Sequence, residues 1–450
     1  MHRHLRLVVC AALLLPAQTA VAQQAPPDRV RAWREDLDSA VTVFLHKRDK
    51  TFSPTERAAF ETAVATLRDS AATLRDDQII VRLAKAVALT DNAHTRLYLL
   101  RNRTALRRYP LRVWWFSDGL YVVRTDSAHT ALLGARVVHI AGKTPAALAK
   151  LVAPLYAGND AWHRYLSTYT MTSPEILHGL DIIPNDTLEL EVMPRGATKT
   201  MRARVAPLPL ATTNEPTEAW WDITPQHSGR GANWVSTLPA DTARMPLYLR
   251  NPQRNYWFTY LPASRTLYLS YQRSQEQPDD SMRVFTERFF QKVRARNPQK
   301  LVLDVRFNTG GDLTKSEGFL KKLSELPMAK QKGHLFVIVG NQTFSAGIYA
   351  AALVKELTGA LIVGESVGDR LDFWSEGGNY LMPNSKLSLH YADRFHSYSP
   401  AEYPERKPYD RDLSVTTLEP DLPAPLASVE YFGWRDPALE RIAKYTPKRR

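Results

Sequence analysis

Two short loops in the C-terminal half carry the residue types that acyl-transfer chemistry requires. The first is the loop 308–312, which contains the consecutive glycines Gly310 and Gly311. The second ends at Ser345, directly before the small-residue stretch 346–352. A serine hydroxyl at the start of a helix can act as a nucleophile, and glycine backbone can present N–H groups to a developing oxyanion. The pair therefore points to an enzyme that forms an acyl intermediate on serine.

Each loop directly follows a continuous apolar run. Residues 301–307 read LVLDVRF and precede the glycine loop, and residues 335–340 read LFVIVG and precede the loop that ends at Ser345. A helical stretch separates the two runs. Continuous apolar strands with a helix between them are typical of a parallel β-α-β unit whose strands are covered on both faces. Ligands bind at the carboxyl ends of such strands, and both loops start there.

Both loops also have a purely structural explanation. Serine is a common N-cap residue, so Ser345 could simply cap the helix that follows. A tight turn that needs a positive φ would also select glycine at Gly310 and Gly311. In addition, a serine hydroxyl is a weak nucleophile until a base removes its proton. Nucleophilic catalysis therefore needs a base from elsewhere in the chain.

His94 lies just after a predicted helix in the N-terminal part. The apolar spacing of residues 79–89 predicts this helix, and residues 90–92 favour caps and turns. A single histidine in a turn is usually structural, and this chain has twelve histidines. The position of His94 alone therefore does not identify a base.

Several segments together resemble the C-terminal-processing (tail-specific) serine peptidases, a family that includes the tricorn core. Residues 303–311 look like its D-x-R-x-N-x-G-G signature, and residues 343–347 resemble its nucleophile turn. Residues 91–95, which read DNAHT, resemble the D-x-H-T turn that ends the N-terminal helical part of the family. Further family segments follow in the same order, at 362–365, 381–385 and 419–421. The resemblance covers nearly all of the chain and is most specific in the blocks 301–347 and 360–421.

The resemblance implies a fold that contains an α/β core and is α+β when the chain is taken as a whole. In this family a crotonase/ClpP-like β-α-β core follows an N-terminal helical region and a PDZ-like module. Residues 134–142 resemble the core of that module. It also implies that Ser345 is the nucleophile and that backbone N–H groups of Gly310, Gly311 and Ala346 form the oxyanion hole. We therefore expect a serine-type endopeptidase that cleaves unfolded or C-terminal polypeptide segments.

The stretch 364–371 departs from the pattern of many family members. Those members place a catalytic lysine shortly after the fourth core strand, whereas this stretch contains none. Its one basic residue, Arg370, stays protonated in proteins and cannot act as a base. Tricorn-like members take a histidine from the helical part instead, and His94 occupies that place. Glu365 and Glu376 are both candidates for a carboxylate that orients this histidine, as in catalytic triads.

The missing lysine keeps a second function open. A catalytically weak relative could use the same cleft to bind a peptide or an apolar ligand. The sequence contains no H-E-x-x-H metal motif and no G-x-x-x-x-G-K-[ST] phosphate loop, so we expect neither a metal nor another cofactor. The net charge of +13 is spread along the 450 residues and forms no basic stripe, which argues against nucleic-acid binding.

Residues 1–22 are typical of a secretory signal peptide. A basic start is followed by the apolar run 7–16 and by a small-x-small cleavage pattern, AVA, at 20–22. The only cysteine, Cys10, lies in this segment, so we expect a mature protein without thiols or disulfides. A retained anchor is the alternative, but the apolar run is short for a membrane span. We therefore expect a periplasmic or secreted protein without stable membrane insertion.

Composition and periodicity divide the rest of the chain into four segments: a helical region (23–105), a β-rich module (106–205), a connector (206–263) and a second large unit (264–450). The resemblance implies that the second segment is the PDZ-like module and the fourth the peptidase core. In the first segment, Ser53 and Glu56 form a capping box. The second contains four short apolar runs that predict strands, at 113–116, 120–123, 135–140 and 188–192. It could bind an extended peptide by adding it to a sheet edge, or it could be a structural insertion.

Overall fold

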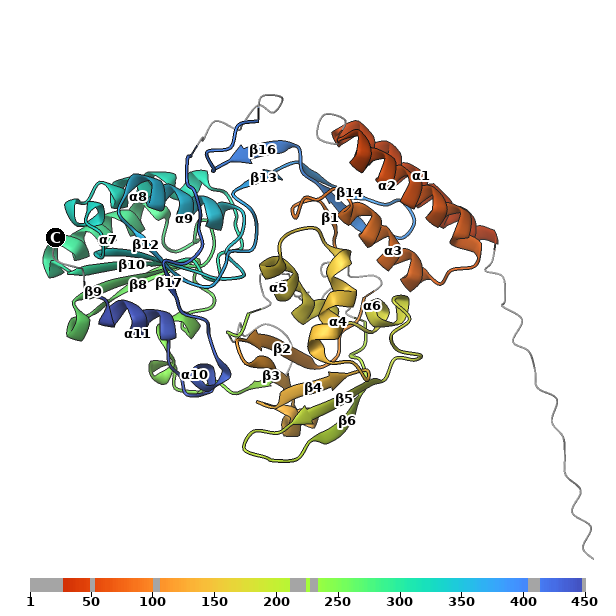
Figure 1. The fold of residues 1–450 in the computed structure, drawn as a ribbon, viewed down its shortest axis with the longest axis horizontal. Helices are drawn as coiled ribbons and strands as arrows, with labels where there is room; N and C mark the ends of the chain where they lie inside the picture. The colour runs from red at the N-terminus through yellow and green to blue at the C-terminus, as the bar shows by residue number, and fades with distance from the viewer. Residues whose placement is uncertain are drawn as a thin grey trace, which may run out of the picture.

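The computed structural model describes residues 27–48, 53–99, 106–210, 224–226, 234–403 and 413–446. The predicted signal peptide, with Cys10, lies outside these residues. Figure 1 shows three parts: a sheet covered by helices on the left, a second sheet below, and a group of long helices at the upper right. Among the helices of the described residues, none is long and apolar enough to cross a membrane.

The core is a six-stranded sheet in the order β17-β12-β11-β10-β9-β8. Its strands are β8 (Tyr256–Leu261), β9 (Thr266–Tyr271), β10 (Lys300–Asp304), β11 (Leu335–Val339), β12 (Leu361–Gly364) and β17 (Leu422–Pro423). β10 and β11 are parallel, with Leu301 opposite Leu335, and α8 (Thr314–Ser324) lies between them in the chain. The predicted parallel β-α-β unit is confirmed.

β8 is the antiparallel edge of this sheet, with Tyr256 opposite Tyr271. The core sheet therefore begins inside the segment 206–263, which the sequence predicts to be a connector. The strand reads YWFTYL, and every residue after Tyr256 is half-buried. A half-buried strand is predicted from alternating apolar and polar residues, and this run of mostly aromatic residues lacks that alternation. The local sequence pattern therefore does not predict β8.

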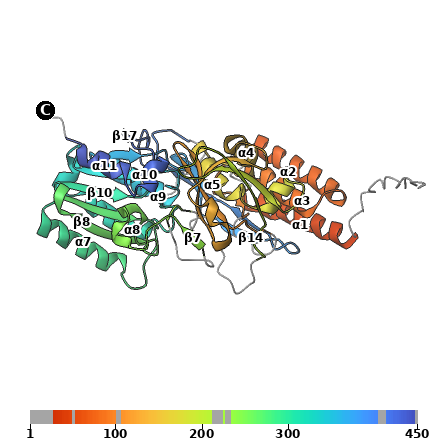
Figure 2. The same cartoon turned by 90° about the horizontal axis from the view of Figure 1, so that it is seen from below.

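Helices cover both faces of the core sheet (Figure 2). α7 (Met282–Arg296), α8 and α9 (Ala346–Leu357) pack on one face, and α11 (Pro437–Lys444) packs on the other. Successive residues of β10 point to alternate faces. Leu301 and Leu303 join the cluster beneath α7 to α9, whereas Val302 joins the cluster beneath α11. Burial of both faces explains why the strand sequences are continuously apolar.

The β-rich module is an antiparallel sheet in the order β2-β3-β4-β5-β6, and β7 (Trp234–Ser236) pairs with β3. Its strands are β2 (Leu111–Phe116), β3 (Gly119–Asp126), β4 (Arg136–Ile140), β5 (Leu188–Met193) and β6 (Met201–Val205). The first four coincide with the four predicted strands, except that β4 begins at Arg136, one residue later than predicted. The helices of this module are α4 (Pro145–Val152), α5 (Asp160–Thr170) and α6 (Pro174–Gly179), and α5 packs against β2.

The N-terminal part contains α1 (Pro27–Arg48), α2 (Pro54–Asp69) and α3 (Asp76–Ala88). The predicted capping box is present at the start of α2. The Ser53 side chain accepts a hydrogen bond from the Glu56 N–H at 3.2 Å, and the Glu56 carboxylate accepts one from the Ser53 N–H at 2.8 Å. α3 buries its apolar face, including Leu83 and Val87, against its neighbours.

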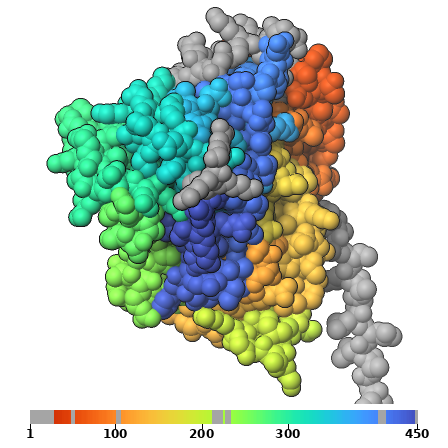
Figure 3. Space-filling view, turned by 60° about the vertical axis from the view of Figure 1, so that its left-hand side comes forward, coloured from red at the N-terminus to blue at the C-terminus, as the bar shows by residue number. Residues whose placement is uncertain are grey.

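Residues 372–397 leave the core and reach the N-terminal helices. β13 (Asp372–Ser375) pairs with β16 (Arg394–Ser397), and β14 (Gly378–Leu381), β15 (Ser388–Tyr391) and β1 (Arg96–Leu97) form a three-stranded sheet. In Figure 3 the blue C-terminal residues lie between the green and cyan core and the orange and yellow parts. Leu387 and Leu389 belong to the same hydrophobic cluster as α1 to α3. The segment 264–450 therefore contributes to two parts of the molecule.

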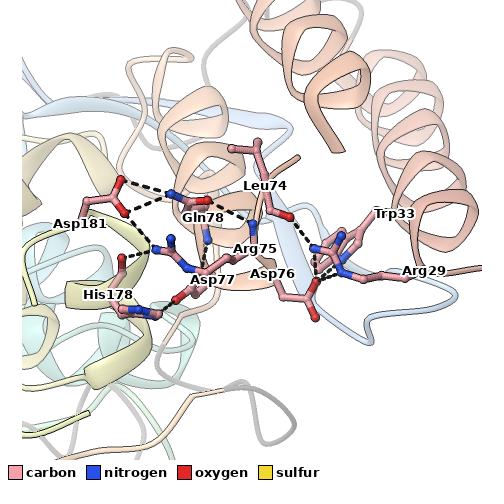
Figure 4. A network of polar contacts seen from close by, with 9 residues as sticks. All are labelled: Arg29, Trp33, Leu74, Arg75, Asp76, Asp77, Gln78, His178 and Asp181. Carbon is pink, nitrogen blue, oxygen red and sulfur yellow. Dashed lines mark hydrogen bonds and ion pairs between the residues drawn. The ribbon is translucent and has the colours of Figure 1, made fainter. Parts of the chain in front are cut away.

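Polar contacts anchor the first turn of α3 on two sides (Figure 4). On one side, the Asp76 carboxylate accepts hydrogen bonds from Arg29 and Trp33 of α1, both at 2.7 Å. On the other side, the Arg75 guanidinium donates to the His178 carbonyl at 2.8 Å and to Asp181 at 2.9 Å, at the end of α6. These contacts fix the helix whose opposite end leads to His94.

Asp36 of α1 binds the turn between β14 and β15. Its carboxylate is fully buried and accepts hydrogen bonds from the backbone N–H groups of Asn384 and Ser385, at 2.8 Å and 2.7 Å. The Asn384 side chain donates a third hydrogen bond at 3.0 Å. Because charge-assisted hydrogen bonds are the stronger ones, this carboxylate holds the C-terminal hairpin on the N-terminal helices.

We predict that Asp36→Ala lowers the free energy of unfolding by about 1–3 kcal/mol, because two partly buried N–H groups lose their charged acceptor. Asp38→Ala is the control. It removes an exposed ion pair with Arg68 and should cost less than ~1 kcal/mol. Urea unfolding followed by circular dichroism measures both variants. Equal losses would show that the buried carboxylate does not hold the hairpin.

Candidate active site

Ser345 stands at a strained junction between β11 and α9. Its φ of 55° and ψ of −124° lie in a region that residues with a side chain rarely adopt. Ser345 is the N-cap residue of α9, but its side chain makes no capping hydrogen bond. The capping explanation therefore does not account for this serine. A strained strand-to-helix turn that presents a serine hydroxyl is the geometry of a nucleophile elbow.

The glycine loop packs directly against this turn. Gly310 and Gly311 have φ values of 109° and 133°, which glycine adopts readily. A Cβ atom on Gly310 would lie 2.7 Å from the Ser345 Cβ and 3.1 Å from its Oγ. A Cβ atom on Gly311 would lie 2.4 Å from the Ser274 carbonyl oxygen. Both glycines are therefore required by backbone conformation and by close contact, and Gly310 touches the candidate nucleophile.

Asn308 holds the glycine loop and the nucleophile turn together. Its Oδ1 accepts a hydrogen bond from the Gly310 N–H at 2.9 Å, and its carbonyl oxygen accepts one from the Phe344 N–H at 3.0 Å. A Cβ atom on Gly347 would meet the same carbonyl oxygen at 2.3 Å, so only glycine fits there. The asparagine in the family-like signature thus has a clear structural role.

The expected oxyanion donors differ in their availability. The Gly310 N–H already donates to Asn308, so this N–H is occupied. Within the described residues, the N–H groups of Gly311 and Ala346 have no such acceptor. Ala346 is the first residue of α9, where N–H groups have no partner inside the helix. Gly311 and Ala346 are therefore the stronger candidates for an oxyanion hole.

His94 packs against the nucleophile turn through a column of stacked rings. Its imidazole lies between the rings of Phe344, at a centroid distance of 4.3 Å, and Phe373 of β13, at 5.0 Å. Trp162 of α5 stacks on the other face of Phe344 at 4.0 Å, and His396 of β16 stacks on Phe373 at 5.4 Å. Because Phe344 directly precedes Ser345, the fold brings the predicted base and the predicted nucleophile into one site.

Burial determines the charge state of His94. The side chain is only 6% exposed, and desolvation lowers its pKa well below the ordinary value, with further lowering from Arg96. His94 is therefore neutral at neutral pH, which is the state that can accept a proton. In the described structure neither ring nitrogen makes a hydrogen bond, so none joins His94 to Ser345. Catalytic hydrogen bonds in ligand-free sites are often long and tighten only when substrate binds.

The carboxylate beside His94 is Asp369. Its Oδ2 lies 3.6 Å from the His94 Nδ1, and both side chains are buried. Burial raises the pKa of Asp369 to about 7, although the nearby Arg370 opposes this rise. Arg370 itself donates two hydrogen bonds of 2.8 Å to Asp91, which ties the lysine-free stretch to the turn that carries His94.

The two carboxylates that the sequence offers for this orienting role lie elsewhere. Glu376 contacts His396, with its Oε2 2.7 Å from the His396 Nε2. Glu365 lines a separate pocket at the end of β12. The sequence motifs do not single out Asp369, although it lies in the lysine-free stretch 364–371. A usable signal was present, because an aspartate among small and apolar residues just after a core strand is a candidate for burial at the ligand-binding edge.

Solved structures of CPAF share this architecture. Mature CPAF, determined alone and in complex with lactacystin, aligns with 92% of this chain and with 96% and 97% of its own chain. The TM-score is 0.57 and the sequence identity 12% in both cases. The photosystem II D1 C-terminal processing protease aligns with 92% of this chain and 97% of its own, at a TM-score of 0.39 and 12% identity. No family model and no curated protein matches the sequence.

The chain therefore shares the fold of mature CPAF. A shared fold does not by itself establish a shared reaction. The activity must be argued from the geometry of Ser345, His94 and the glycine loop.

We predict that Asp369→Asn changes how stability depends on pH. The unfolded chain ionises this carboxyl near its ordinary pKa of 3.8, whereas the folded chain keeps it protonated up to about pH 7. The folded state therefore binds the extra proton, and wild-type stability falls as the pH rises through this window. Relative to the variant, the wild type should lose about 2–3 kcal/mol between about pH 5 and about pH 8.

Urea unfolding at these two pH values measures the effect, and Asp393→Asn, which changes an exposed carboxyl, is the control. If the wild type and Asp369→Asn show the same pH dependence, Asp369 is ionised in the folded protein at low pH and the assigned environment is wrong.

Proposed function

We propose that the protein is an exported serine endopeptidase that cleaves unfolded or C-terminal polypeptide segments through an acyl-enzyme on Ser345. The observation that carries this proposal is the strained Ser345 turn packed between Gly310 and the ring column of His94. The predicted signal peptide supports export. The motifs that resemble those of C-terminal-processing serine peptidases, together with the fold shared with mature CPAF, support a hydrolase.

The first half-reaction forms the acyl-enzyme. His94 accepts the hydroxyl proton as the Ser345 Oγ attacks the carbonyl carbon of the scissile bond. The carbonyl oxygen becomes an oxyanion, which the N–H groups of Gly311 and Ala346 stabilise. When the tetrahedral intermediate collapses, the C–N bond breaks and His94 transfers its proton to the leaving amine.

The second half-reaction releases the product. Water attacks the ester carbon while His94 accepts one of its protons, and the same two N–H groups stabilise the second oxyanion. Collapse of this intermediate returns the proton to the Ser345 Oγ and frees a carboxylic acid. The Asp369 carboxylate, 3.6 Å from the His94 Nδ1, is placed to stabilise the imidazolium that forms in each step.

One observation favours a second candidate, a relative that binds peptides without efficient turnover. Both nitrogens of His94 lack a hydrogen-bond partner in the described structure, so the base is not yet engaged with Ser345. A fluorophosphonate probe separates the two functions, because only an activated serine reacts with it. Labelling of the wild type that disappears in Ser345→Ala supports the peptidase, and absence of labelling supports the binding protein.

We predict that Ser345→Ala lowers hydrolysis of casein, an unstructured protein, by about three orders of magnitude or more while the fold stays intact. Ser281→Ala is a matched control, since Ser281 is also the N-cap residue of a helix, directly before α7 and outside the site. Casein turnover and circular dichroism are measured for both variants. Unchanged turnover in purified Ser345→Ala would exclude this serine as the nucleophile.

We also predict that kcat/KM rises with pH through a single acidic limb below ~6.5, because burial lowers the His94 pKa and only neutral imidazole accepts the proton. Phe373→Leu should open one face of the imidazole to water and move this limb to higher pH. Phe258→Leu, in β8, should leave it in place. A limb that persists unchanged in His94→Ala would mean that another group titrates.

A further inference from the structure

A groove runs along the outer edge of the core sheet, and it is not part of the candidate active site. The edge strand β8 forms one wall and the helix α7 forms the other, around a volume of about 840 Å³. Neither Ser345 nor His94 is among its lining residues. The groove therefore needs an explanation separate from acyl transfer.

β8 is an unprotected edge strand. It pairs with β9 residue by residue from Tyr256 to Leu261, without a bulge, and it contains no charged residue, proline or glycine. Proteins usually protect sheet edges with such residues, with bulges or with very short strands, because free backbone groups at an edge pair readily with another chain. The opposite edge of the same sheet, β17, is only two residues long and ends at Pro423. Of the two edges, β8 is the one suited to accept a further strand.

Phe258 and Tyr260 direct their backbone groups away from β9. The Gln272 N–H donates to the Asn255 carbonyl at 2.7 Å, and the register places these two residues opposite each other. Hydrogen-bonded and open pairs alternate along an antiparallel ladder, and the residues of open pairs face the other edge. Counting from Asn255, the N–H and C=O groups of Phe258 and Tyr260 face the groove. Within the described residues these four groups have no hydrogen-bond partner, so they are available to an added strand.

α7 lines the groove with a row of cations. Arg288, Lys292 and Arg296, here called the cation row, follow one another at intervals of four residues and so lie on one face of the helix. The row runs along β8, because the Arg288 guanidinium lies 5.8 Å from the centre of the Phe258 ring and the Arg296 guanidinium lies 5.6 Å from that of Tyr260. Four helical residues span about 6 Å, and alternate residues of a strand are about 6.8 Å apart. The cation row therefore matches the spacing of side chains on one face of an extended chain.

Positive charge exceeds negative charge in the groove. Besides the cation row its lining includes Arg254, whereas Asp280 is its one carboxylate. Asp280 pairs with Arg288 and Arg254. Within the described residues Lys292 and Arg296 form no ion pair. A second copy of this chain paired through β8 would bring an identical cation row to the same edge, so like charges oppose that occupant. Acidic side chains complement the groove.

We propose that the edge of β8 binds an extended acidic segment of another polypeptide, which adds to the core sheet as a strand. The backbone of this segment pairs with the outward N–H and C=O groups of Phe258 and Tyr260, which provides affinity. Carboxylates at every second residue of the segment pair with the cation row, which provides selectivity. The site goes beyond the proposed peptidase activity and does not depend on it.

Fluorescence anisotropy of labelled peptides tests the site in the full mature chain that carries Ser345→Ala, which prevents cleavage of the probe. The probe is a short peptide in which glutamate alternates with valine, and the matched peptide has glutamine in place of each glutamate. We expect the glutamate peptide to bind at least about tenfold more tightly, because charge-assisted hydrogen bonds form only with carboxylates. Equal binding of the two peptides, or no binding of the glutamate peptide, would overturn the proposal.

A double variant tests the role of the cation row. Lys292→Gln with Arg296→Gln should weaken binding of the glutamate peptide about tenfold or more, because two charged partners are lost. Arg283→Gln with Arg294→Gln is the matched control, since it removes the same charge from exposed positions of α7 that do not line the groove. The control should bind as the parent does. Equal weakening by both double variants would reflect net charge alone and would contradict a role of the cation row.

N-methylated peptides test the pairing with β8. One version of the glutamate peptide is N-methylated at every glutamate and another at every valine. In a strand, residues whose side chains share a face also direct their N–H groups to the same edge. One version should therefore lose binding about tenfold or more, because its methyl groups block the hydrogen bonds to β8, while the other binds like the unmodified peptide. Equal binding of the two methylated peptides would show that no strand is added.

Sedimentation of the peptide-free chain tests the competing occupant, a second copy. We expect no dimer that the glutamate peptide dissociates. Such a dimer would assign the groove to self-association and overturn the proposal. Because binding and not turnover is measured throughout, failure of the peptidase proposal leaves these tests intact.

Discussion

The stacking of His94 between Phe344 and Phe373 is the contact on which the candidate site depends. It joins the end of α3, the turn before α9 and the strand β13, three segments that are far apart in the chain. The rings fix the plane of the imidazole, and they also exclude water, which keeps the histidine neutral. A close ion pair would orient the ring but would favour the protonated form. Stacking therefore orients the imidazole and burial keeps it neutral, although the lowered pKa also reduces its affinity for a proton.

The same burial leaves several polar groups without partners. The two nitrogens of His94 and the Oδ2 of Asp369 make no hydrogen bond within the described structure. Unsatisfied buried groups cost free energy and are uncommon except where function requires them. Close packing around the site holds these groups in place, since Asn308 and Arg370 tie its loops together through hydrogen bonds. Strain at Ser345 persists for the same reason, because the surrounding contacts determine the turn.

The end of β12 supplies carboxylates to two different environments. Asp369 lies beside His94, whereas Glu365 lines the separate pocket toward the β-rich module. Desolvation raises the pKa of both, yet their neighbours differ: a stacked imidazole in one case and the guanidinium groups of Arg164 and Arg306 in the other. A residue at the carboxyl end of a strand thus lies at the ligand-binding edge of the sheet. The packing of other segments decides which groups surround it there.

The sequence by itself determined the parts that depend on local pattern. The continuous apolar runs predict the parallel strands β10 and β11, Ser53 and Glu56 predict the start of α2, and the glycines of the loop 308–312 predict a turn with positive φ. The family-like motifs predict the fold. Only the tertiary structure showed that β8 joins the core sheet, that residues 378–391 pack with the N-terminal helices, and that Asp369 rather than Glu365 or Glu376 lies beside His94. Local spacing reports which residues share a face of one element, but it carries no information about which distant segment packs there. Long-range packing alone therefore decided the partner of His94.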